Sequence, residues 1–109
     1  MSLLRDHASE HSGDIIAKSG AEREALKPLL DYLSAWNLRD IVKMKAAFHF
    51  PHVRIASGKV KLLEEDAAFS EDFFEHFIKA TGWHYSLWDY RHAVQSTRDK
   101  VHFAVQFTR

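Results

Sequence analysis

Residues 31–40 constrain the fold more than any other part of this 109-residue chain. Apolar residues before Trp36 recur at helical spacing, Asn37 favours turns and helix starts, and Asp40 suits the first turn of a new helix. An extended run at residues 48–55, which contains Pro51, follows almost at once. The order of helix, short helix and strand is typical of an α+β domain in which helices close over a curved sheet and leave a pocket.

Two helices are predicted in the first half of the chain. Ser19 and Glu22 have the spacing of a capping box, which satisfies exposed N–H groups at a helix start. Apolar residues then fall on one helical face: Leu26, Leu29, Leu30, Leu33 and Trp36. Because an interior proline disrupts a helix, Pro28 predicts a break near Lys27 and a solid helix over residues 28–36. Asn37 is then expected to cap the second helix.

The second half of the chain is predicted to form a hairpin, a helix and two longer strands. Ser57 and Gly58 are typical of a tight turn that leads into a strand at residues 59–62. Acidic residues at 64–66 and a stripe of phenylalanines predict a third helix that ends at Gly82. An aromatic extended stretch covers residues 83–94, and a turn at 97–100 precedes the last strand. That strand alternates between faces, with one face made of Val101, Phe103, Val105 and Phe107.

Composition restricts the class of protein. Lys plus Arg and Asp plus Glu are equal at 15 each, so no global charge attracts nucleic acid or an anionic membrane. The chain has no Cys, which excludes disulfides and a cysteine nucleophile and fits a cytoplasmic setting. No run approaches the roughly 20 apolar residues that span a bilayer. We expect a soluble, single-domain protein with neither nucleic acid nor a membrane as a partner.

The chain resembles the nuclear transport factor 2-like superfamily, which includes SnoaL-like and ketosteroid-isomerase-like proteins. The resemblance rests on the run Tyr-Leu-Ser-Ala-Trp-Asn-Leu-Arg-Asp at residues 32–40, the strand at 48–55 and the helix and aromatic strands of residues 64–109. It implies an α+β cone over residues 19–109, with about three helices on a curved, mainly antiparallel sheet. Residues 1–18 are expected to be a flexible N-terminal segment. Two further strands usually follow the position of Arg109 in that family, so the resemblance also implies a shortened chain or a sheet completed by another subunit.

The isomerase site of that family matches this chain at one position only. Tyr32 has the spacing of the tyrosine that donates a hydrogen bond to the developing oxyanion. Ala56 stands at the position of the carboxylate base and cannot take a proton. The second oxyanion donor belongs to a strand that would follow Arg109. The resemblance therefore implies the scaffold and a pocket, and it does not imply steroid isomerisation.

His52 and Arg54 form the most promising polar pair, because residues two apart on a strand share a face. With Tyr32 and His84 they are the candidate catalytic residues, as a general base, a cationic clamp and a hydrogen-bond donor. The candidate ligand-binding walls are aromatic: Trp36, Tyr85 and Trp88. The same polar residues also fit a sheet face at a dimer interface, and the aromatics also fit a packed core.

Neither a metal nor a cofactor is expected. His49 and His52 lie three apart and face opposite sides of a regular strand, and zinc needs three or four ligands. No phosphate loop or dinucleotide fingerprint is present.

Two functions fit these patterns. The first is a SnoaL-like protein whose pocket binds a small apolar or amphipathic molecule, with cofactor-free isomerase, dehydratase or hydrolase activity as its catalytic form. The second is a non-catalytic dimerisation or interaction domain with a packed cavity. A homodimer through the sheet is expected, and the sequence specifies no substrate.

Overall fold

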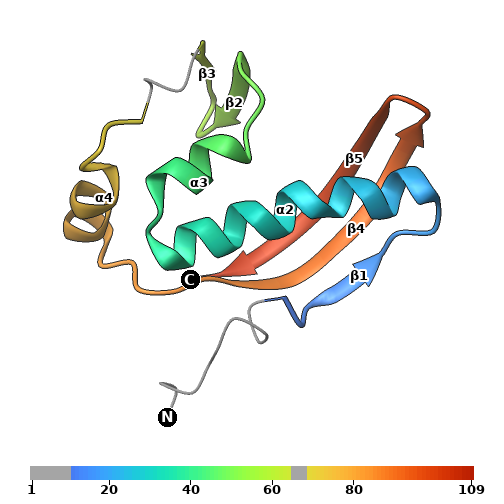
Figure 1. Ribbon diagram of the computed structural model, residues 1–109, viewed down its shortest axis with the longest axis horizontal. Helices are drawn as coiled ribbons and strands as arrows, with labels where there is room; N and C mark the ends of the chain where they lie inside the picture. Colours follow the sequence, from blue (N-terminus) through green and yellow to red (C-terminus); the bar gives the residue numbers. More distant parts are fainter. Residues whose placement is uncertain (1–10, 65–68) are drawn as a thin grey trace.

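The computed structural model describes residues 11–64 and 69–109, which form an α+β fold (Figure 1). The helices of these ranges are α2 (Gly20–Leu38), α3 (Ile41–Ala46) and α4 (Phe73–Thr81). The strands are β1 (Asp14–Ile16), β2 (His52–Ala56), β3 (Lys59–Leu63), β4 (Leu87–Thr97) and β5 (Lys100–Thr108). The predicted fold class, about three helices packed with mainly antiparallel sheets, is confirmed.

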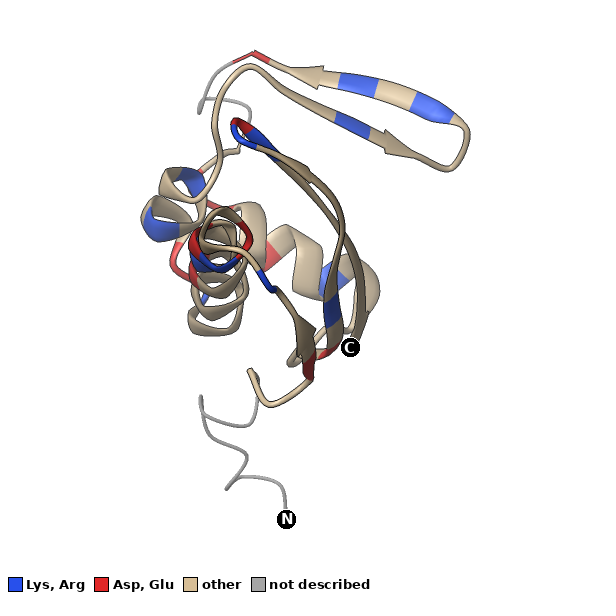
Figure 2. Ribbon diagram, turned by 90° about the vertical axis from the view of Figure 1, so that its right-hand side faces the viewer, with Lys and Arg blue, Asp and Glu red and all other residues tan. Residues whose placement is uncertain are grey.

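The main sheet has the strand order β1-β4-β5. β5 is antiparallel to β4, with Trp88 opposite Phe107, and β1 is parallel to β4. Two residues of β4, Asp89 and Val94, have no partner in β5, so the strand contains two bulges. Because a bulge bends its strand and increases the local twist, the pair β4–β5 is curved. Figure 2 shows this sheet arching around α2.

The face of the sheet toward α2, called the inner face below, carries the apolar residues of β5. Val105 and Phe107 lie on it and line a cavity together with residues of α2. Farther along β4, the Ser96 hydroxyl donates a hydrogen bond to Glu22 of α2, with 2.6 Å between Oγ and Oε2. The predicted alternation of the last strand thus puts Val105 and Phe107 on one face, although they are still 39% and 48% exposed.

α2 is one continuous helix, so the predicted break near Lys27 is wrong. Its start is capped as predicted, since the Ser19 Oγ accepts the N–H of Glu22 at 3.0 Å. Pro28 lies inside the helix. α2 packs on β4 and β5, and the free energy of this packing exceeds the cost of the backbone hydrogen bond that Pro28 cannot make. The helix ends at Arg39, whose backbone is left-handed with φ 56°.

Asn37 does not cap α3, contrary to the prediction, because Asp40 has that role. The Asp40 Oδ1 accepts the N–H of Lys43 at 3.0 Å. Asn37 is a buried residue in the last turn of α2, and its amide binds the backbone of Ser86 through both heteroatoms. Nδ2 donates to the Ser86 carbonyl oxygen at 2.9 Å, and Oδ1 accepts the Ser86 N–H at 2.9 Å. These bonds tie the end of α2 to the segment that enters β4.

The core is aromatic and is formed by α2, α3, α4 and Trp83. Its most buried members are Ala35, Met44, Phe74 and Trp83. Trp36 has ring centroids 5.0 to 5.7 Å from four neighbouring rings in edge-to-face geometry: Phe73, Phe74, Phe77 and Trp83. The predicted phenylalanine stripe of the third helix thus packs inward, and α4 ends at Gly82 (φ 72°) as predicted. The predicted start at residues 64–66 lies mostly outside the described residues, and α4 begins only at Phe73, so Phe69 of the predicted stripe precedes the helix.

β2 and β3 form a separate hairpin that stands apart from β4 and β5 in Figure 1. Ser57 and Gly58 have φ of 53° and 73°, as the predicted tight turn requires. β2 begins at His52 and not at residue 48, directly after Pro51, which has no N–H to donate to a ladder. One face of the hairpin consists of four apolar residues that are each more than half exposed: Val53, Ile55, Val60 and Leu62.

Within the predicted flexible segment 1–18, residues 11–18 are described and contain a strand. Residues 14–16 form β1 and pair with residues 90–92 of β4. A Cβ at Gly13 would lie 2.3 Å from the carbonyl oxygen of Trp88, so this approach of two backbones requires glycine. The Arg91 Nη2 donates to the carbonyl oxygen of His11 at 2.8 Å. Contacts with β4 therefore hold the chain from residue 11 onward.

Candidate functional site

A cavity of about 310 Å³ lies between the second half of α2, α4 and the inner face of β4 and β5. One wall is the face of α2 that carries Leu29, Tyr32, Leu33 and Trp36. The remaining lining comes from α4, β2, β4, β5 and the segment before β4: Arg54, Phe77, Trp83, Ser86, Trp88, Val105, Phe107 and Arg109. The volume is at the lower end of the range of small-molecule sites, about 300–1,000 Å³.

Tyr32 is the central polar residue of this lining. Its ring makes edge contacts with Trp36 and Phe48, at centroid distances of 5.9 and 5.4 Å. Burial raises the pKa of the Tyr32 phenol, while the Trp36 indole and the charges of Arg54 and Arg109 act in the opposite direction. The phenol is neutral near pH 7 and has an O–H to donate.

Arg54 and Arg109 bring positive charge to the cavity. Arg54 belongs to β2, and Arg109 follows β5 with its guanidinium carbon 5.8 Å from the centroid of the Phe107 ring. Neither arginine forms an ion pair within the described residues. The described lining also contains no Asp, Glu or His. The charge at this cavity is therefore positive, with no acidic side chain in its walls to neutralise it.

The walls contain a buried hydrogen-bond donor without a partner. Within the described residues, the indole N–H of Trp88 is buried and makes no hydrogen bond. Such a donor costs roughly 1–3 kcal/mol when it is unpaired. The Trp83 N–H differs, because it donates to the Ser86 Oγ at 2.8 Å. Donors thus outnumber acceptors around the cavity.

The structure brings together some of the predicted site residues and separates others. Tyr32 and Arg54, from the predicted catalytic set, line one cavity with two of the predicted walls, Trp36 and Trp88. The other three predicted site residues are not part of the described lining: His52, His84 and Tyr85.

The physical reasons differ for the two histidines. The His52 ring packs on Phe48, with 4.7 Å between the ring centroids. His84 is exposed, and only its carbonyl oxygen is used, as an acceptor for Arg39 Nη2 at 3.2 Å. Because β4 begins at Leu87, residues 84 and 85 do not follow the strand alternation on which their prediction depended. No imidazole of the described residues is in position to act as the general base of this cavity.

Several lining residues were not predicted as site residues. Val105, Phe107 and Arg109 share the inner face by strand alternation, so the pattern of β5 contains a signal for Arg109. Ser86 lies two residues before Trp88, so strand alternation groups it with that predicted wall. Its backbone is held by Asn37, 49 residues earlier in the chain, and only the folded structure reveals that contact.

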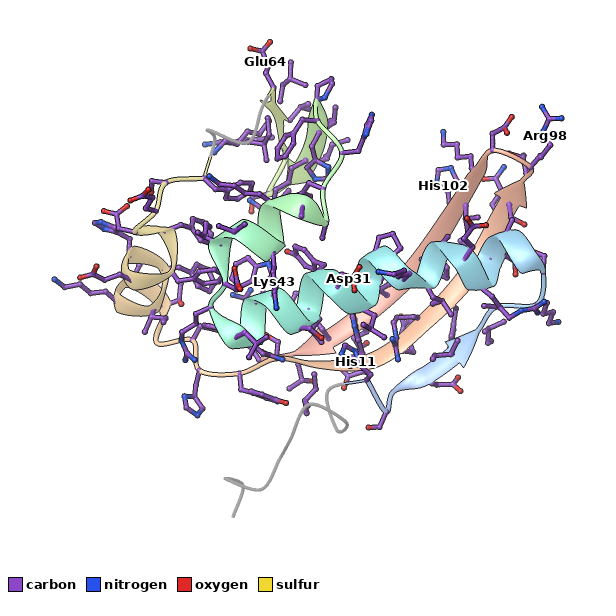
Figure 3. The ribbon with its side chains drawn as sticks, in the orientation of Figure 1. His11, Asp31, Lys43, Glu64, Arg98 and His102 are labelled. Carbon is purple, nitrogen blue, oxygen red and sulfur yellow. The ribbon has the colours of Figure 1, made fainter. Side chains whose placement is uncertain are left out.

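A second, larger groove of about 580 Å³ lies between α2, residues 46–47 and the β4–β5 turn. Its lining has three acidic and three basic side chains, of which Lys27 pairs with Asp31 at 2.7 Å and Arg98 with Asp99 at 3.4 Å. Figure 3 shows Asp31 on α2 and Arg98 at the tip of the β4–β5 turn, at the exposed edge of the molecule. Because its charges balance and its sides are open, we favour the smaller cavity as the functional site.

No protein-family model, curated protein or solved structure matches this chain. Within residues 11–64 and 69–109, no group of three or more His, Asp or Glu side chains could hold a metal ion. No helix of the same ranges has the length and apolar character that a membrane crossing requires. The cavity is therefore the feature from which a function has to be inferred.

Proposed function

We propose that this protein binds a small apolar or amphipathic molecule in the cytoplasm, as a SnoaL-like member of the nuclear transport factor 2-like superfamily. One observation carries the proposal, the cavity of about 310 Å³ that has Tyr32 and Arg54 in its lining. A cone packed solid with side chains would have favoured a structural role. Here an open volume and two polar groups from different elements meet instead.

Binding is better supported than catalysis. Tyr32 can donate a hydrogen bond to a carbonyl oxygen, which is one half of the acid/base chemistry of isomerases and dehydratases. The other half is a proton acceptor, and the described lining contains no Asp, Glu or His. Ala56, at the position where the family resemblance places a base, has no ionisable group. We therefore propose a binding protein, with catalysis conditional on a base from outside this lining.

Filling the cavity tests this proposal directly. Val105→Trp places an indole in the cavity, whereas Val94→Trp adds the same bulk at an exposed bulge of β4 and serves as the matched control. Thermal-shift screening with a metabolite library is done on all three proteins. A ligand at about 100 times its Kd stabilises the native state by about 2.7 kcal/mol. We expect hits that shift wild type and Val94→Trp and do not shift Val105→Trp, and equal shifts in all three would contradict the proposal.

The second candidate function is a dimerisation or interaction domain, with a homodimer through a sheet surface. The observation in its favour is the apolar face of the β2–β3 hairpin, where Ile55 and Val60 are 74% and 71% exposed. Contiguous exposed apolar residues often mark protein interfaces.

Light scattering at several concentrations tests this candidate. A charge on the hairpin face, as in Ile55→Lys, is expected to shift a dimer toward monomer. Val94→Lys, also at an exposed valine, is expected to leave it unchanged. A wild-type protein that is monomeric throughout would exclude the homodimer.

A further inference from the structure

Provided that the cavity binds a small molecule as proposed above, the charge of the lining restricts the chemical class of the ligand more than the volume of the cavity does. Its described charged residues, Arg54 and Arg109, have the same sign and come from different strands. No carboxylate of the described residues lies within ion-pair distance of either. Two guanidinium groups in the lining of one cavity, with no counter-ion among the described residues, favour the binding of an anion.

Tyr32 lines this cavity together with both arginines. The charges of Arg54 and Arg109 lower the pKa of its phenol, although burial has the larger and opposite effect. The phenol O–H and the two guanidinium groups are all hydrogen-bond donors. A ligand that meets them has to provide oxygen acceptors.

The rest of the lining has a different character. Trp36 contacts Phe77 and Trp83 in edge-to-face geometry, at 5.0 and 5.7 Å between ring centroids. Leu33, Val105 and Phe107 complete an apolar chamber. Flat apolar groups gain most from such walls, since aromatic rings contact one another at edges and faces.

We infer that the cavity binds an amphipathic organic carboxylate, with the carboxylate at Arg54 and Tyr32 and a flat apolar body between α2 and β5. A guanidinium matches the two oxygens of a carboxylate geometrically, and a phenol O–H adds a third bond. One carboxylate and a body of about two fused rings suit both the donors and the volume.

Two probes of equal shape and different charge test the inference: 2-naphthoate and 2-naphthylmethanol. Each is titrated by calorimetry at pH 7 into wild type, Arg54→Met and Arg98→Met. Methionine removes the charge and keeps much of the apolar stem. Arg98 is the matched control, because it is exposed at the β4–β5 turn and lines only the other groove.

Wild type is expected to bind 2-naphthoate at least about tenfold more tightly than the alcohol, the ratio for one charge-assisted hydrogen bond. Arg54→Met should remove that difference and leave the affinity for the alcohol unchanged, while Arg98→Met should behave as wild type. Added salt should weaken only the naphthoate complex, because Arg54 is exposed. Equal affinities for both probes in wild type would overturn the carboxylate inference and leave the binding pocket intact. Failure of wild type to bind either probe would overturn both.

Discussion

Replacing Asn37 by Ala is expected to destabilise the fold more than any exposed substitution. Asn37 is 7% exposed and Ser86 is 5% exposed, and two hydrogen bonds of 2.9 Å join them. The substitution leaves the buried N–H and C=O of Ser86 unpaired, at about 1–3 kcal/mol each. A total of about 2–6 kcal/mol is a large share of the roughly 5–15 kcal/mol that stabilises a typical domain. At about 4 °C per kcal/mol, the melting temperature should fall by about 8–24 °C.

Thermal and urea denaturation of Asn37→Ala and Gln106→Ala measure this effect. Gln106 is the control because it is exposed and makes one amide hydrogen bond, to Asp89 at 3.2 Å. Its substitution should change stability by less than about 0.5 kcal/mol. A loss in Asn37→Ala as small as that of the control would refute the conclusion that this amide fastens α2 to β4.

Asn37→Asp separates the two bonds. The carboxylate keeps an acceptor for the Ser86 N–H and places a second oxygen against the Ser86 carbonyl. Burial should raise the pKa of this new carboxyl, so its protonated form is the one that the fold stabilises. Stability lost at pH 7 should therefore be partly regained as the pH falls toward 4, and a loss independent of pH would contradict this geometry.

Three further predictions concern glycine, an acidic residue and a tyrosine. Gly13→Ala should destabilise the native state by about 1–3 kcal/mol, because the new Cβ would meet the Trp88 carbonyl. Gly20→Ala, with open space around it, should stabilise the native state by up to about 1 kcal/mol. Equal melting temperatures of the two variants would contradict the placement of β1. Hydrogen bonds from Ser70 and then His76 lower the pKa of Asp72, so its stabilisation is present above about pH 4 and lost below it. Asp72→Asn should flatten the acid dependence of the melting temperature, and Glu71→Gln should not. Burial raises the pKa of Tyr32, so ultraviolet titration of the 3 tyrosines should show one phenol ionising above about pH 10, and Tyr32→Phe should remove that step.

Local periodicity predicted much of the fold. The capping box at Ser19, the turn at Ser57, the end of α4 at Gly82 and the alternation of β5 each depend on neighbouring residues, and each was found. The α+β class follows from their order.

The wrong predictions share one cause: contacts between residues far apart in the sequence determine the local structure at these positions. Pro28 predicts a break when α2 is considered alone, yet α2 packs along β4 and β5. The sequence around Asn37 is equally compatible with a helix cap and with a buried amide. The hydrogen bond of Asn37 to Ser86, which the sequence does not reveal, decides between the two roles. Tyr32 and Trp36 could be assigned to the cavity from the sequence, because they lie on a regular helix. The position of His84 could not be predicted, because no local sequence signal shows where β4 begins.

The two bulges of β4 have a consequence for the dimensions of the cavity. β4 has 11 residues and β5 has 9, so β4 has the longer contour of the two and the ribbon has to bend. Removing Asp89 and Val94 together would leave every pair between the strands in its register and shorten that contour, with the loss of the hydrogen bonds that Asp89 accepts from Gln106 and Thr108. The width of the binding chamber therefore depends on two residues outside its lining, and it could be changed by deletion without altering any side chain that a ligand touches.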